Sequence, residues 1–209
     1  MIKSINGIEC TFVNFDINHA NYIMGGNLES PCKIMVGSYT LNFKSLYLFV
    51  DNERIYGGEL NEEHTLSIGK IEFPVTEVYF YYDSDDVDSI TLAVDVEVTI
   101  GDFTLILTTK LGYDVTFHPN GDIMSCFLKE STCLEIYGYT IHCQSIGFGE
   151  GAKVSGVVPF YDAELNVNGN SYIFEGGHGD PTNCIYTISF NQNGQIDKGT
   201  LTDGRYISF

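Results

Sequence analysis

Apolar and polar residues alternate along most of the chain. In the clearest stretch, from Ile90 to Leu107, one face would carry Val94, Val96, Val98 and Ile100, and the other Asp95 and Glu97. This period of two predicts a β-strand with one solvated face. No long segment shows the i, i+3, i+4, i+7 spacing of an amphipathic helix. We therefore expect an all-β fold of short antiparallel strands with almost no helix.

The strongest signal is a repeated motif, Phe-x-x-Asn-x-x-Ile-x-x-(small)-x-Leu. Its three copies begin at Phe49, Phe117 and Phe190, and they start 68 and 73 residues apart. A second matched piece precedes each copy and begins at Val36, Ile100 and, more loosely, Asn168. The three internal repeats span about residues 32–73, 94–141 and 161–209, and we expect one contiguous domain over residues 1–209.

Each motif describes a β-hairpin. Asn-Gly at 120–121 and 193–194 predicts tight turns in which both residues have positive φ, whereas Asn-Glu at 52–53 predicts another turn type. The Phe before the turn and the Ile after it can pack as a cross-strand pair. One hairpin cannot bury its apolar face alone, but stacked hairpins can. We expect antiparallel hairpins stacked into an extended sheet, a roll or a sandwich.

The form Phe-x-x-Asn-Gly-x-Ile-x-x-Gly-x-Leu, seen from Phe190 to Leu201, resembles the Asn-Gly hairpin repeats of the MORN type. It is most similar to a bacterial variant with an aromatic residue before the Asn-Gly turn. The resemblance implies a sheet-like scaffold with a binding surface on one face and no catalytic residues. Bacterial proteins with such repeats resemble antitoxins, so an immunity role against a basic toxin is one form of the implied function.

The charge balance narrows the class of partner. The 209 residues include 28 acidic and 10 basic side chains, for a formal net charge of −18. A nucleic-acid binder needs Lys and Arg to displace counterions from phosphate, so we expect no nucleic-acid partner. The same charge disfavours docking on anionic lipid. It favours a basic protein partner, which long-range attraction would draw in.

The chain shows no membrane or export signal in its sequence. The longest apolar runs, Leu46–Val50 and Val78–Tyr82, are five residues long, whereas a membrane helix needs about 20. No apolar segment follows Lys3, so we expect no signal peptide and a cytoplasmic protein. The six cysteines have no zinc-ligand spacing, and we expect reduced, mostly buried thiols.

Four carboxylates in six residues form a candidate metal site: Asp83, Asp85, Asp86 and Asp88. Closely spaced oxygens of this kind can hold Ca²⁺, although the positions that follow do not match an EF-hand loop. The alternative is a solvated acidic turn at the end of a strand. We expect no other cofactor.

The strand before this turn carries a candidate binding patch. Tyr79 and Tyr81 would share one face and Val78, Phe80 and Tyr82 the other. Tyrosine pairs are enriched at interfaces, so the segment Tyr79–Asp88 is a candidate partner, carbohydrate or Ca²⁺ site. The alternative is a strand buried on both sides.

The Gly-rich segment from Glu175 to Pro181 contains His178 and Asp180, followed by Cys184. These residues would make a catalytic centre only if they converged in a cleft. The alternative is a surface loop that contacts a partner through His178 and Asp180. Because the sequence contains no nucleophile elbow and no phosphate-binding loop, we expect a non-enzymatic β-repeat scaffold that binds a protein partner.

Overall fold

A computed structural model describes residues 1–18, 23–49, 54–109, 114–180 and 186–209, with the side chains of 130 and 131 left out. The described chain is almost entirely antiparallel β-structure, which confirms the predicted fold class. It divides into two compact units. Unit 1 comprises residues 1–94 and 117–122, and unit 2 comprises residues 95–116 and 123–209.

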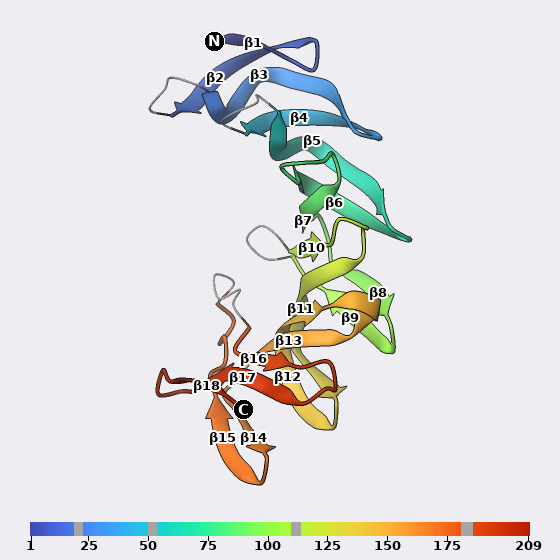
Figure 1. Cartoon of the computed structure of the whole chain (residues 1–209). Helices are drawn as coiled ribbons and strands as arrows, with labels where there is room; N and C mark the ends of the chain where they lie inside the picture. Colours follow the sequence, from blue (N-terminus) through green and yellow to red (C-terminus); the bar gives the residue numbers. More distant parts are fainter. Residues whose placement is uncertain (19–22, 50–53, 110–113, 181–185) are drawn as a thin grey trace. The chain divides into compact units, whose positions relative to one another are not determined.

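Neighbouring strands of unit 1 pair in chain order. They are β1 (Ile2–Ile5), β2 (Ile8–Ile17), β3 (Ile23–Val36), β4 (Tyr39–Leu48), β5 (Ile55–Ile68), β6 (Ile71–Phe80) and β7 (Val87–Leu92). Figure 1 shows these strands in colours that run from blue to green. The strand β10 (Val115–Phe117) is divided between the two units: its last residue belongs to unit 1 and the residues before it belong to unit 2.

Unit 2 contains the remaining strands and one 3-10 turn, Glu150–Ala152. Its main sheet has β11 (Ile123–Ile136), β12 (Tyr139–Phe148), β13 (Val154–Pro159), β16 (Ile188–Phe190), β17 (Ile196–Thr200) and β18 (Tyr206–Ser208). The hairpin of β8 (Val96–Ile100) and β9 (Phe103–Leu107) joins β11 through β9, and β14 (Ala163–Val167) and β15 (Asn170–Phe174) form a separate ribbon (Figure 1).

One long hairpin recurs along the chain. In β3–β4, β5–β6 and β11–β12 a 14-residue strand, a two-residue turn and a 10-residue strand follow one another. Each pair has an irregularity at the same place, where four residues of the first strand face one of the second. The register shifts fall between Asn27 and Cys32, between Glu59 and His64, and between Phe127 and Thr132. These extra residues bend the strand, as β-bulges do.

In two further copies the same insertion interrupts the first strand and divides it into two shorter strands. Between β7 and β8 residues 93–95 leave the strand, and between β13 and β14 residues 160–162 do so. The five copies therefore begin at Ile23, Ile55, Val87, Ile123 and Val154, with spacings of 32, 32, 36 and 31 residues. The first two repeats marked by the sequence motif each combine parts of two such copies, and the third combines part of the last copy with the strands β16, β17 and β18. The single-domain organisation stays a prediction.

Each hairpin tip is a two-residue turn in which at least one residue has a positive φ. Asn6-Gly7, Tyr137-Gly138 and Asn168-Gly169 have positive φ at both positions. Gly37, Gly69 and Gly101 have positive φ at the first position only. These are the type I′ and type II′ turns whose twist matches that of paired strands. The tips begin at residues 6, 37, 69, 101, 137 and 168, so they recur with about the same spacing as the copies.

The Asn-Gly motifs at 120–121 and 193–194 adopt a different turn from the predicted one. Only Gly121 and Gly194 have positive φ, not the asparagines before them. Gly121 N donates to His118 O at 2.8 Å, and His118 N donates to Asp122 O at 2.8 Å. This pattern is a type I turn followed by a left-handed glycine, which closes a longer loop. Residues 52–53 lie outside the described residues.

The predicted strand from Ile90 to Leu107 is also corrected. Val98 and Ile100 are buried as expected, but Val94 is 52 % exposed. The reason is the insertion at residues 93–95, which ends β7 at Leu92 and starts β8 at Val96. Ala93 N then donates to Pro74 O at 2.9 Å, outside the regular ladder. Simple alternation could not show this bend.

The core forms because the tip of one copy packs on the segment that precedes the copy two further along. Phe73 contacts Phe117 with ring centroids 5.5 Å apart in unit 1. In unit 2, Phe103 lies 6.5 Å from Phe148, and Tyr139 lies 6.2 Å from Phe190. The aliphatic residues at the first position of each copy are also buried, namely Ile23, Ile55, Val87, Ile123 and Val154.

The five described cysteines carry free thiols, of which Cys10, Cys126 and Cys143 are buried. Burial raises the pKa of the Cys10 thiol to about 12, with a further contribution from neighbouring Cys32. Burial likewise raises the pKa of Cys143 to about 12. Cys184 lies outside the described residues. The described residues contain no helix with the length and apolarity to cross a bilayer.

Candidate functional site

Two cross-strand rows define one face of the unit 1 sheet, which we call the outer face. The polar row consists of Asn14, Asn27, Ser45, Glu59, Glu77 and Thr91. The glycine–tyrosine row consists of Asp16, Gly25, Tyr47, Gly57, Tyr79 and Ser89. Residues between the rows, such as Leu46, Val78 and Ile90, are fully buried on the opposite face. The side-chain alternation of paired strands therefore separates this face from the core.

The glycine–tyrosine row places two aromatic rings over one glycine. Tyr47 and Tyr79 both pair with Gly57 from neighbouring strands, and their rings stack at 6.1 Å with an interplanar angle of 13°. A Cβ at Gly57 would lie 2.5 Å from Tyr79 Cδ1, so a side chain there would displace the ring. Tyr79 is 7 % exposed, whereas Tyr47 is 40 % exposed. The pair thus has one covered ring and one open ring.

The aromatic row continues toward the acidic turn. Tyr56 lies 5.4 Å from Tyr79, and Phe49 lies 5.1 Å from Tyr56 and 5.0 Å from Tyr82. Tyr82 at the end of this chain of contacts is exposed. Open tyrosine rings at both ends give the face a large apolar contact area with polar hydroxyl groups.

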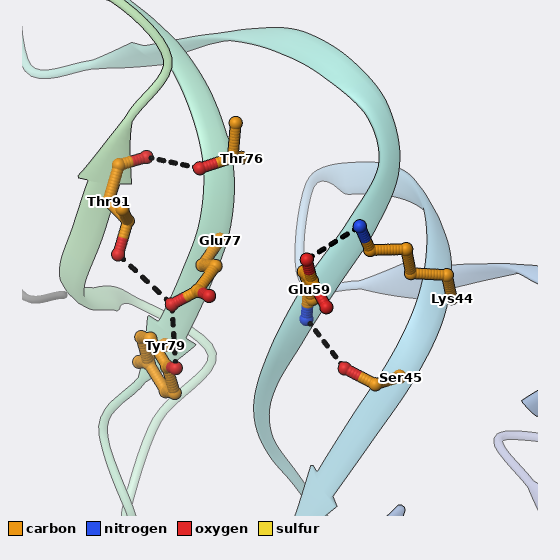
Figure 2. A network of polar contacts seen from close by, with 7 residues as sticks. All are labelled: Lys44, Ser45, Glu59, Thr76, Glu77, Tyr79 and Thr91. Carbon is orange, nitrogen blue, oxygen red and sulfur yellow. Dashed lines mark hydrogen bonds and ion pairs between the residues drawn. The ribbon is translucent and has the colours of Figure 1, made fainter. Parts of the chain in front are cut away.

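The polar row brings two like charges together. Glu59 and Glu77 are directly opposite each other on β5 and β6. Lys44 Nζ lies 2.5 Å from Glu59 Oε1, as Figure 2 shows. Glu77 Oε2 instead accepts hydrogen bonds from the hydroxyls of Tyr79 and Thr91, both at 3.0 Å (Figure 2). Directly opposed like charges destabilise a sheet, so this pair is a local cost in the fold.

The outer face consequently has an excess of negative charge. Asp16, Glu59 and Glu77 contribute three carboxylates, and in the described part of the chain only Lys44 is seen to form an ion pair with any of them. Neutral donors orient Glu77 but do not neutralise it. A face of carboxylates beside open tyrosine rings can bind a cation through ionic hydrogen bonds and ring contacts. The described residues contain no group of three or more His, Cys, Asp or Glu able to hold a metal ion.

In unit 2 the corresponding positions are covered by the chain itself. Gln144 occupies the position in β12 that Lys44 has in β4, and it is 2 % exposed. Its Nε2 donates to Asp180 O at 2.7 Å, and its Oε1 accepts from Gly179 N at 2.8 Å. Tyr186 packs over Gly147 and Gly156, the equivalents of Tyr47 and Gly57. A backbone segment therefore lies where the unit 1 face is open.

We expect Gln144→Ala to release this covering segment. The substitution removes two hydrogen bonds and leaves a buried polar site unfilled, so stability falls by about 1–3 kcal/mol. Amide exchange at Gly179 should become faster. The matched control is Gln195→Ala, since Gln195 is exposed and its loss should cost within about 0.5 kcal/mol. Unchanged exchange at Gly179 in the Gln144 variant would contradict the assignment.

The structure does not bring Tyr79 and Tyr81 together as one patch. Val78, Tyr79 and Phe80 are all buried, so β6 is covered on both sides at this point. Tyr81 follows the strand, and its hydroxyl donates to Phe117 O. Burial, followed by the nearby Asp88 carboxylate, raises the pKa of Tyr81.

The four aspartates of the acidic turn have different surroundings. Asp85 Oδ1 lies 2.7 Å from the Arg54 guanidinium, and Arg54 also donates to Tyr82 O at 2.8 Å. Asp88 is half-buried, which raises the pKa of its carboxyl, although a hydrogen bond from the Ser89 hydroxyl acts in the opposite direction. Asp83 and Asp86 are exposed. A Ca²⁺ site at these residues stays a prediction.

His178 and Asp180 lie in the covering segment of unit 2. His178 has φ of 49° and, with Gly179, forms a tight turn in which Asp180 N donates to Gly177 O. His178 Nε2 lies 3.1 Å from Asp162 Oδ1, and both side chains are well exposed. The ion pair of His178 seen in the structure is therefore with Asp162, and a partner-binding role of His178 and Asp180 stays a prediction. Cys184, the third member, lies outside the described residues.

Tyr47, Glu59 and Glu77 were not among the predicted site residues. Their signal was the spacing of the glycines, since Gly25 and Gly57 are 32 residues apart, as are Tyr47 and Tyr79. Comparison of the chain with protein-family models, with curated proteins and with solved structures found no match. The arrangement of the site therefore rests on this chain's own geometry.

Proposed function

We propose that the protein is a non-enzymatic β-repeat scaffold that binds a protein partner of basic character. The outer face of unit 1 supports this proposal, because it combines three carboxylates, one lysine and open tyrosine rings. The formal net charge of −18 adds long-range attraction for a cationic partner. Neutralisation of a basic toxin is one concrete form of this function.

The test is capture by immobilised protein from a lysate of the source organism, washed at low and then at high salt. A basic protein should be retained at low salt and released at high salt, because screening weakens attraction between exposed charges. The control is an unrelated immobilised protein of similar acidity. Retention that does not depend on salt, or equal retention by the control, would contradict the proposal.

A further inference from the structure

The outer face of unit 1 has a feature that selects among basic side chains. We propose that it binds an arginine of an extended partner segment, with the guanidinium on Glu77 and the aliphatic stem along the Tyr47–Tyr79 pair. This inference rests on the proposed function and names the chemistry of its site. The inference concerns one type of partner side chain, arginine, and one carboxylate of this protein, that of Glu77.

Glu77 presents an oriented carboxylate with open capacity. Its Oε2 accepts from Tyr79 and Thr91, which hold the carboxylate in one orientation on the outer face (Figure 2). Its Oε1 has no hydrogen-bond partner among the described residues. Guanidinium groups approach such carboxylates through parallel N–H groups in a fixed fork, which an ammonium group cannot do.

The opposed glutamates supply a reason for the cation to bind here. Lys44 Nζ lies 2.5 Å from Glu59, whereas Glu77, on the paired position of the next strand, forms no ion pair among the described residues. A second cation at Glu77 would offset the repulsion that the free protein carries. Residues that break a local rule of sheet stability in this way are frequent at functional sites.

The exposed Tyr47 ring, which stacks on the buried Tyr79 ring, supplies the contact area for the stem. Tyr47 is 40 % exposed, and its ring lies parallel to that of Tyr79. The stem contributes apolar contact with the ring, and the preference for arginine over lysine comes from the planar guanidinium at Glu77. The pair lies two residues along from Glu59 and Glu77, on the same side of the sheet.

Unit 2 shows how a segment can occupy this face. There the segment around Gly177–Asp180 lies against Gln144, at the position equivalent to Lys44. Tyr186 covers the glycines that correspond to the Tyr47–Gly57 pair. In unit 2 this part of the sheet therefore accepts a backbone segment together with one aromatic side chain of that segment, and the equivalent residues Lys44 and Tyr47 of unit 1 are exposed to a partner.

The experiment compares two peptides of equal length and charge, an Arg-Gly-Ser repeat and a Lys-Gly-Ser repeat, by isothermal titration calorimetry at low salt. The arginine peptide should bind about fivefold or more tightly than the lysine peptide. Glu77→Gln should weaken the arginine peptide about tenfold. Nuclear Overhauser contacts should join arginine δ protons to the Tyr47 ring.

The matched control is Glu164→Gln. Glu164 Oε1 also accepts from a hydroxyl, that of Ser171 at 2.6 Å, but it lies on the ribbon β14–β15 of unit 2. This variant should bind the arginine peptide within twofold of the parent. Equal affinities for the two peptides, or equal losses in the two variants, would overturn the arginine site and leave the basic scaffold standing. If neither peptide binds at low salt, both the arginine site and the attraction for basic segments fail.

Discussion

Phe73→Ala should destabilise unit 1 by about 3–5 kcal/mol, as expected for a large aromatic side chain removed from a packed core. Phe73 is fully buried, and its ring meets that of Phe117 edge to face at 5.5 Å. This contact joins one hairpin to the segment before the copy two further along. Its loss leaves a cavity and also removes the geometry that aromatic pairs favour. Urea denaturation followed by circular dichroism measures the change.

Two further variants distinguish the contact between the Phe73 and Phe117 rings from the effect of burying each ring alone. If Phe73 and Phe117 stabilise each other, the double Ala variant should cost about 0.5–1.5 kcal/mol less than the sum of the single ones. Val94→Ala is the control, because Val94 is 52 % exposed, and it should cost within about 0.5 kcal/mol. Strict additivity would show that the two rings act independently.

Gly57→Ala should destabilise the protein by about 2–3 kcal/mol, although it adds a single methyl group. The new Cβ would lie too close to Val78 O and 2.5 Å from Tyr79 Cδ1. Either β5 separates from β6 or the Tyr79 ring leaves its place beside Tyr47. Both outcomes lower the melting temperature and change the near-ultraviolet circular dichroism of the stacked tyrosines.

The matched control for this change is Gly149→Ala. A Cβ at Gly149 has its nearest neighbour, Ser155 Cβ, at 3.9 Å, and the backbone there is extended. The same added methyl group should therefore alter stability by no more than about 0.5 kcal/mol. Equal effects of the two substitutions would show that the close approach at Gly57 does not constrain the fold.

The fold class could be predicted from the sequence because alternation and turn residues are local signals. The repeat of about 32 residues could not be found from the Phe-x-x-Asn motif, since this motif marks only every second copy. Copies that begin at Val87 and Val154 have other residues before them, Asp85-Asp86 and Ala152-Lys153. The tip dipeptides, from Asn6-Gly7 to Asn168-Gly169, carry the shorter period and could have shown it.

The candidate site was harder to predict because it depends on register. Glu59 and Glu77 are 18 residues apart in sequence, and only the insertion in β5 makes them opposite each other. A hairpin without that insertion would pair different residues. Tyr79 was among the residues named from the sequence, but its contact with Tyr47 crosses β5 and leaves no pattern in the sequence.

The packing of each hairpin tip against the copy two further along has a consequence for how the chain folds. A single copy, or two in succession, lacks the segment that would cover its tip. The smallest self-sufficient nucleus therefore needs three successive copies, and each later copy can then add to an existing template. Loop closure over two periods should make this nucleus slow to form, and propagation from it fast.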